Sequence, residues 1–150
     1  MSDNEAFLLT GVSVFDGTGA APVPGQAIVV EGRRISWMGP QADAPSFTAE
    51  RTFDGAGGTV MPGMINCHVH VCNDGVGDLF AQVRDDSVPI STVRGVKNLA
   101  LALESGVTSV RDCGAADGIA IELSKAVEDG MIPGPRIRAA GRVITMTGGH

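Results

Sequence analysis

Two of the three histidines in the chain are separated by a single residue, in the segment His68-Val69-His70. In an extended strand, side chains two positions apart point to the same face, so the two imidazoles would project together. Neutral imidazole is a ligand for Zn²⁺, Fe²⁺ and Mn²⁺. Asn66 precedes the pair by two positions and, by the same alternation, shares its face. These residues predict a metal site with His68 and His70 as ligands and Asn66 as a supporting side chain behind them.

The cysteines allow a different metal site. Cys67, Cys72 and the two histidines between them could form a structural zinc cluster, although strand alternation turns Cys67 to the opposite face. The chain has three cysteines and no CxxC pair, which argues against a disulfide framework and favours a reducing compartment. The ordinary role of such cysteines is small apolar filling. The paired histidines are therefore the favoured site, and the zinc cluster is an alternative.

The elements that would position the histidine pair follow from the periodicity of the chain. Residues 6–60 show no helical period and combine β-branched residues with turn clusters, which predicts an N-terminal β-sandwich over residues 1–60. From residue 61 the pattern alternates between strand and helix, which predicts βαβ units and a parallel sheet. The expected strands are 64–71, 107–110 and 136–140, with helices at 87–105 and between Asp117 and Gly130.

The expected fold class is α/β. A TIM-like (β/α)₈ barrel takes about 250 residues, or roughly 30 for each unit, so residues 61–150 would hold its first three βα units. Sites in such folds lie at the C-terminal ends of the strands, where the histidine pair falls. We expect the 150 residues to be the N-terminal portion of a longer protein. By themselves they should be neither compact nor active.

The composition excludes several classes of protein. Apolar residues make up 43% of the chain, which is enough for a core, and the formal net charge is −6. A nucleic-acid-binding protein needs a basic face, and the sequence shows none. The N-terminus is acidic, and no apolar run reaches the length of a membrane span. We expect a cytoplasmic protein that binds neither nucleic acid nor membrane, and that forms a homo-oligomer.

Several segments resemble one family. Residues 59–70 (TVMPGMINCHVH) resemble the first-strand signature of the amidohydrolase superfamily, V-x-P-G-x-I-D-x-H-x-H, with Asn66 where the signature has Asp. Residues 106–112 are similar to its second-strand segment. Residues 133–136 and 147–150 are similar to the third-strand region of the imidazolonepropionase-like branch, which includes Xaa-Pro and Xaa-Arg dipeptidases. The resemblance implies a metal-dependent hydrolase of amide C–N bonds, with one or two divalent ions, zinc foremost. A small molecule or a dipeptide, such as an N-acyl amino acid, would be the substrate.

The resemblance also implies roles for residues near the site. Family members complete the metal site with a carboxylated lysine, two further histidines and an aspartate that is the general base, all expected beyond residue 150. His150 would lie near the substrate, and Asp112 would form an ion pair with Arg111 or face the mouth of the barrel. A deaminase or cyclic amidase of the same superfamily is an alternative. So is an inactive homologue, of which Asn66 would be a sign.

Overall fold

The computed structural model describes residues 6–48, 51–75 and 77–147. The chain divides into two compact units, Met1–Pro62 and Gly63–His150, whereas the sequence pattern placed the boundary after residue 60. Each unit has a hydrophobic core of its own. In the described part of the chain, no helix combines the length and the apolar character needed to cross a membrane.

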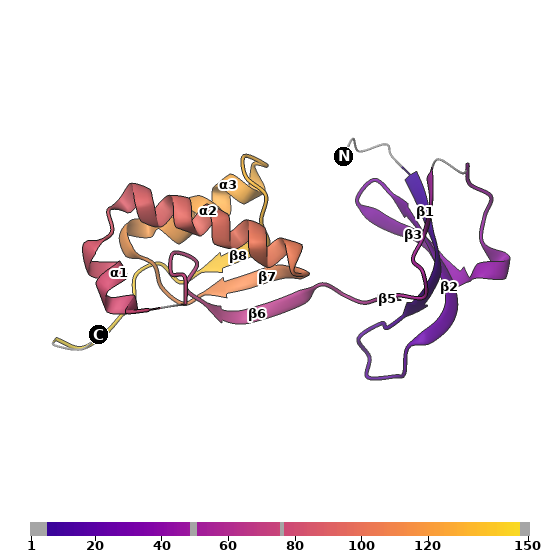
Figure 1. The fold of residues 1–150 in the computed structure, drawn as a ribbon, viewed down its shortest axis with the longest axis horizontal. Helices are drawn as coiled ribbons and strands as arrows, with labels where there is room; N and C mark the ends of the chain where they lie inside the picture. The colour runs from indigo at the N-terminus through magenta and orange to yellow at the C-terminus, as the bar shows by residue number, and fades with distance from the viewer. Residues whose placement is uncertain (1–5, 49–50, 76, 148–150) are drawn as a thin grey trace. The chain divides into compact units, whose positions relative to one another are not determined.

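The first unit is built on a single five-stranded sheet (Figure 1). Strands β1, β2 and β3 form an antiparallel meander, and β4 and β5 both pair with β1 in parallel. Leu8, Ala27 and Val29 form its small buried core. The expected β-sandwich is therefore represented, among the described residues, by one sheet only. The strands are β1 (Ala6–Val14), β2 (Val23–Glu31), β3 (Arg34–Pro40), β4 (Thr52–Asp54) and β5 (Thr59–Val60).

The second unit has the predicted alternation of strands and helices. Its three strands pair in parallel in the order β6-β7-β8, so the predicted parallel sheet is confirmed. This is the arrangement that the first units of a barrel require, and the barrel itself stays a prediction. The elements in chain order are β6 (Met64–Val69), α1 (Leu79–Asp85), α2 (Val88–Glu104), β7 (Val107–Asp112), α3 (Ile119–Glu128) and β8 (Arg136–Ala139).

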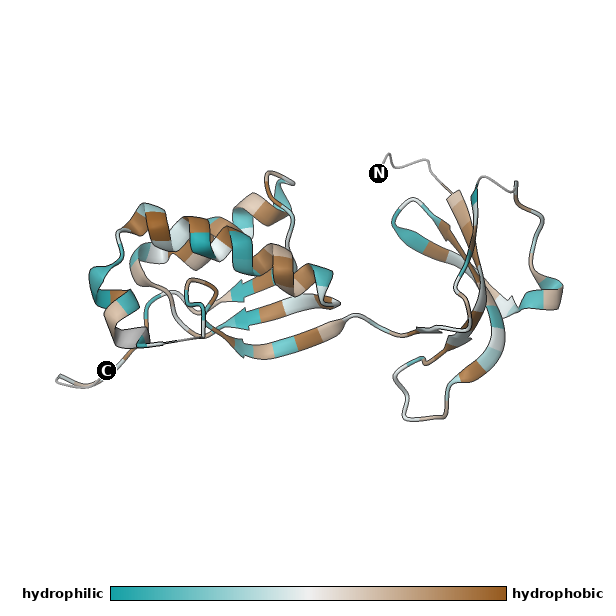
Figure 2. Cartoon of the chain, in the orientation of Figure 1, coloured by the Kyte–Doolittle hydropathy of each residue, from teal (hydrophilic) through white to brown (hydrophobic). Residues whose placement is uncertain are grey.

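Helices α2 and α3 lie over one face of this sheet (Figure 1). Hydrophilic residues interrupt the hydrophobic ones along these strands and helices, as expected for elements buried on one side (Figure 2). At Gly95 of α2, a Cβ would lie 2.6 Å from Leu123 Cδ1, so glycine allows α2 and α3 to pack closely. The buried core between sheet and helices consists of Val71, Cys72, Leu99, Val110, Ala115, Ile119, Ala120, Leu123 and Ile137.

Candidate functional site

The histidine pair lies at the C-terminal end of β6, the edge at which parallel α/β folds place their sites. The imidazole rings of His68 and His70 have their centroids 5.5 Å apart and are inclined at 67°, and both residues are exposed. The structure thus brings together the two side chains that the sequence singled out as metal ligands.

The strand reaches this geometry by an irregular register rather than by simple alternation. Asn66 is opposite Val110 and Val69 is opposite Asp112, so three steps along β6 match two along β7. Such irregularities redirect side chains at strand ends. Val110, which pairs with Asn66, is buried under the helices, whereas Asn66 itself is exposed. Because the register shifts between Asn66 and Val69, alternation alone does not place Asn66 on the face of the histidines, and that shared face stays a prediction.

Asn66 nevertheless contacts the site through the backbone. Its Oδ1 accepts a hydrogen bond from the backbone N–H of His68 over 3.1 Å. This is a local turn-type bond of the kind that asparagine forms with the residue two positions ahead. Asn66 therefore supports the main chain that carries His68 and does not orient its ring.

The ring of His70 is held by a hydrogen bond. Its Nδ1 lies 2.9 Å from the carbonyl oxygen of Gly114, in the loop that follows β7. A carbonyl oxygen only accepts, so the proton of the neutral ring is on Nδ1 and the lone pair is on Nε2. Histidines that bind metals commonly donate their other ring N–H to a carboxylate or a backbone carbonyl in this way. The lone pair of His70 that remains available is therefore the one on Nε2.

Asp112 lies beneath the histidine pair and is fully buried, with 0% of its surface exposed. Its Oδ2 accepts the backbone N–H of Val71 over 2.9 Å, and its Oδ1 accepts the N–H of Gly114 over 3.0 Å. Arg111 is exposed, because successive residues of a strand point to opposite faces. The expected ion pair between Arg111 and Asp112 is therefore wrong, and Asp112 holds two backbone groups instead.

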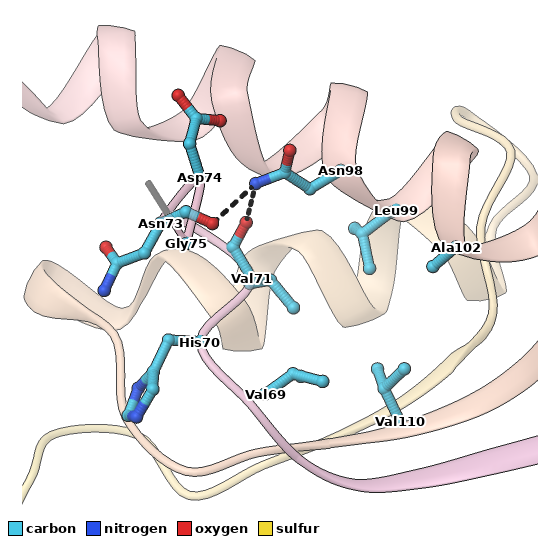
Figure 3. A pocket seen from close by; sticks show the side chains of 10 residues that line it. All are labelled: Val69, His70, Val71, Asn73, Asp74, Gly75, Asn98, Leu99, Ala102 and Val110. Atoms are coloured by element: carbon cyan, nitrogen blue, oxygen red, sulfur yellow. Dashed lines mark hydrogen bonds between the residues drawn. The ribbon is translucent and has the colours of Figure 1, made fainter. Parts of the chain in front are cut away.

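Helix α2 holds the segment that follows His70. Asn98 donates from Nδ2 to the carbonyl oxygens of Val71 (2.9 Å) and Asn73 (3.0 Å), as Figure 3 shows. Asn98 was not predicted to have a role at the site. The available signal was a polar residue one position before Leu99, on the side of α2 that faces the core.

Arg94, one turn earlier on α2, adds ionic contacts to the same segment. Its guanidinium is 3.0 Å from Asp74 and 2.5 Å from Asp86, and it also donates to the carbonyl oxygen of Cys72. The hydrogen bond to Asp86 raises the pKa of Arg94 above its ordinary value. Arg94 was not predicted from the sequence either, because a single arginine on a helix is usually a solvated surface residue.

The alternative zinc cluster is not formed. Cys72 belongs to the buried core and Cys67 is exposed. Burial, with a contribution from the negative charge of Asp112, raises the pKa of the Cys72 thiol to about 11, so that the thiolate a zinc ion needs is disfavoured. Among the described residues, no group of three or more His, Cys, Asp or Glu side chains is arranged to hold a metal ion.

The residues present fit part of a metal centre. Two adjacent imidazoles, one with its tautomer fixed, match the donors that zinc prefers, whereas a catalytic zinc site generally has three protein ligands. Completion of the centre requires ligands beyond the described residues. His150, expected near the substrate, also lies outside them.

A pocket of about 720 Å³ opens beside His70, which is a volume typical of small-molecule sites. It lies between the loops that follow β6 and β7 and the first turns of α2. Its lining includes Asn73, Gln82, Arg94, Gly114, Asp117 and Arg142. His70 also borders a smaller, largely apolar hollow of about 320 Å³ under α2 (Figure 3). His70 is therefore accessible to a small molecule.

Comparison with known proteins defines the class. The model of the amidohydrolase family matches residues 59–149, and the chain belongs to this family. Ochratoxinase from Aspergillus niger is 31% identical over 133 residues, which cover 86% of this chain and 27% of ochratoxinase. Imidazolonepropionase from Acidiphilium cryptum is 41% identical over 56 residues, which cover 37% of this chain and 14% of that enzyme.

Solved structures show the same similarity. A Xaa-Pro dipeptidase with bound methionine superposes with a TM-score of 0.82 at 27% identity, covering 97% of this chain and 36% of the dipeptidase. A prolidase complexed with N-methylphosphonate-L-proline gives a TM-score of 0.79 at 33% identity, covering 97% of this chain and 34% of the prolidase. The chain thus spans about a third of the length of these solved relatives.

Proposed function

We propose that the protein is a metal-dependent hydrolase of amide C–N bonds, in which His68 and His70 are ligands of a divalent metal, zinc foremost, present as one or two ions. The observation that carries the proposal is the pair of adjacent imidazoles, with the His70 Nδ1–H donated to the Gly114 carbonyl oxygen 2.9 Å away. Membership of the amidohydrolase family supports the same chemistry.

The residues of the site would have different roles in the hydrolysis. A bound divalent ion polarises an amide carbonyl and lowers the pKa of a water molecule. His70 presents Nε2 because its other nitrogen is engaged by Gly114, and His68 lies beside it. The pocket that His70 borders admits the amide. Amide hydrolysis also needs a base to accept a proton. Asp112 does not fill this role, because it is buried and both its oxygens accept backbone N–H groups.

The relatives favour a substrate with an amide bond to an amino acid. They include a prolidase complexed with N-methylphosphonate-L-proline and a Xaa-Pro dipeptidase. We therefore propose a dipeptide or an N-acyl amino acid as the substrate class. The short match to imidazolonepropionase supports a second candidate, hydrolysis of a cyclic amide, which is related chemistry in a differently shaped pocket.

The test is a hydrolysis assay before and after metal removal. The protein is stripped with a chelator and reloaded with zinc, and then assayed on N-acyl amino acids, Xaa-Pro dipeptides and cyclic amides. We expect hydrolysis of one of the two acyclic classes that is lost on stripping and restored by zinc. Activity that survives complete metal removal, or an absence of hydrolysis by a zinc-loaded protein, would contradict the proposal.

A further inference from the structure

The carboxylate of Asp112 connects the two strand ends that meet at His70. One oxygen accepts the N–H of Val71, which belongs to the peptide bond directly after His70 (2.9 Å). The other accepts the N–H of Gly114 (3.0 Å), and the carbonyl of the same glycine accepts from His70 Nδ1 (2.9 Å). A single buried side chain thus fixes both the main chain of His70 and the residue that holds its ring.

The rest of this loop is pinned as well, so that the Gly114 carbonyl has one direction. The backbone N–H of Cys113 donates to the carbonyl oxygen of Val69 (2.9 Å), and that of Ala115 donates to the carbonyl oxygen of Gly141 (3.1 Å). Gly114 itself has a φ of +153°, which L side chains rarely adopt. The N–H between these two anchors is the one that Asp112 accepts.

Only a carboxylate satisfies both peptides at this position. Two N–H donors need two acceptor oxygens, whereas an asparagine of the same shape has one oxygen and one NH₂ group. Asp112 has no ion-pair partner among the described residues, and burying such a group is costly unless it is hydrogen-bonded. An apolar residue at position 112 would avoid the cost of burying a charge. The aspartate is therefore explained by its two acceptor oxygens.

We propose that Asp112 is a positioning residue, which selects the Nδ1–H tautomer of His70 by orienting Gly114 and thereby leaves Nε2 free for metal binding. The first half concerns the imidazole alone, and the second half rests on the function proposed above. His68 provides an internal contrast, since no hydrogen bond reaches its ring from the described residues. Its tautomer should not depend on Asp112.

The imidazole nitrogens of the metal-free protein can be observed directly by ¹⁵N NMR at a pH where the rings are neutral. The variants His68→Gln and His70→Gln assign the signals of the two rings, because each variant removes the signals of one ring. In the unsubstituted protein we expect the Nδ1–H form of His70 to predominate. In Asp112→Asn this form should become the minority, while the signals of His68 stay unchanged.

Two further variants separate positioning from general loss of structure. Leu123→Ala removes a buried side chain of the same core and should leave the tautomer of His70 unchanged. Asp112→Glu keeps both acceptor oxygens and should restore most of the Nδ1–H population. Zinc affinity, measured by competition with a chelator, should fall about 10- to 100-fold in Asp112→Asn, as for other residues that orient a ligand. It should stay within about threefold in Leu123→Ala.

The outcomes separate this inference from the function on which it depends. A proton on Nε2 of His70 in the unsubstituted protein, or an unchanged Nδ1–H population in Asp112→Asn, would overturn the positioning role. If the tautomer responds to Asp112→Asn but the unsubstituted protein binds no zinc, the positioning role stands and the metal function of His70 fails.

Discussion

The two faces of the sheet in the second unit differ in what covers them. One face packs against α2 and α3 and contains the apolar core together with the buried carboxylate of Asp112. Among the described residues, no helix covers the other face, where Arg111 and Arg138 are cross-strand neighbours and Ile65 is 68% exposed. His70 is exposed, yet the groups that hold it, Asp112 and Gly114, are buried. The buried residues therefore determine the orientation of the His70 ring. The exposed histidines provide the nitrogen atoms that would bind a metal.

The largest difference between the two faces should be in stability. Leu99 is 1% exposed, and Leu99→Ala should lower the free energy of unfolding by about 2–5 kcal/mol through lost burial and a cavity. Ile65→Thr keeps a β-branched residue on the face that is open among the described residues, and in the 150-residue chain it should change this free energy by less than about 0.5 kcal/mol. Urea unfolding of both variants measures this. Equal losses would show that the open face is covered in the protein.

The covered face should also give the protein an alkaline limit of stability. The folded-state pKa of Cys72, about 11, is above its ordinary value of 9.0, so folding favours the protonated thiol. The resulting stabilisation is fully present below pH 9 and is lost as the pH rises from 9 to 11, which amounts to about 2 kcal/mol. Residues 1–150 contain no tyrosine, so few other side chains of this segment titrate in the same range.

Urea unfolding at pH 8, 9, 10 and 11 measures the alkaline loss. Cys72→Ala should remove most of the pH dependence, although it also lowers stability at every pH. Cys67→Ala, at an exposed position, should keep the pH dependence of the unsubstituted protein. The same slope in Cys72→Ala as in the unsubstituted protein would be inconsistent with a buried, protonated thiol.

A smaller effect is expected from the helix side chain that holds the loop after His70. Asn98→Ala removes both hydrogen bonds to the carbonyls of Val71 and Asn73 and should cost about 1–2 kcal/mol. Amide hydrogen exchange should increase locally in residues 71–74. Val93→Ala, at a 67% exposed position of the same helix, is the control. Unchanged exchange in Asn98→Ala would show that the loop is held by other contacts.

The smallest effect is expected at Asn66. Aspartate keeps the acceptor oxygen that receives the His68 N–H, so Asn66→Asp should change stability by less than about 0.5 kcal/mol and should leave metal content intact. Activity should be equal or higher. Thermal unfolding and metal analysis after dialysis check this. Loss of the metal on this substitution would mean that the amide itself is required.

The sequence predicted the bounds of the helices and strands better than it predicted which side of each helix is buried. Helix spacing of Ile90, Val93 and Val96 indicated a helix at 87–105, and α2 spans Val88–Glu104. Val93 is nevertheless 67% exposed, whereas Leu99 is buried. The covered side of α2 includes Asn98, whose two partners, Val71 and Asn73, lie 27 and 25 residues earlier in the chain. Such contacts between distant segments are not encoded in local periodicity.

The candidate site, too, was only partly predictable from local sequence. The His68-Val69-His70 spacing was enough to bring the two rings together, and the family resemblance is confirmed by the match over residues 59–149. The irregular register between Asn66 and Val69 was not predictable, because it depends on the pairing of β6 with β7. Neither was the role of Asp112, since the adjacent Arg111 suggested an ion pair that strand alternation prevents.

The central claim is that His68 and His70 are both metal ligands, and the metal content of single-histidine variants tests it most directly. The protein and its variants are loaded with zinc, dialysed against buffer and analysed by atomic emission, with circular dichroism to confirm the fold. His68→Ala and His70→Ala should each lose most of the metal, whereas His150→Ala, which removes the third histidine, should keep it. Stoichiometric zinc in both His68→Ala and His70→Ala would contradict the account.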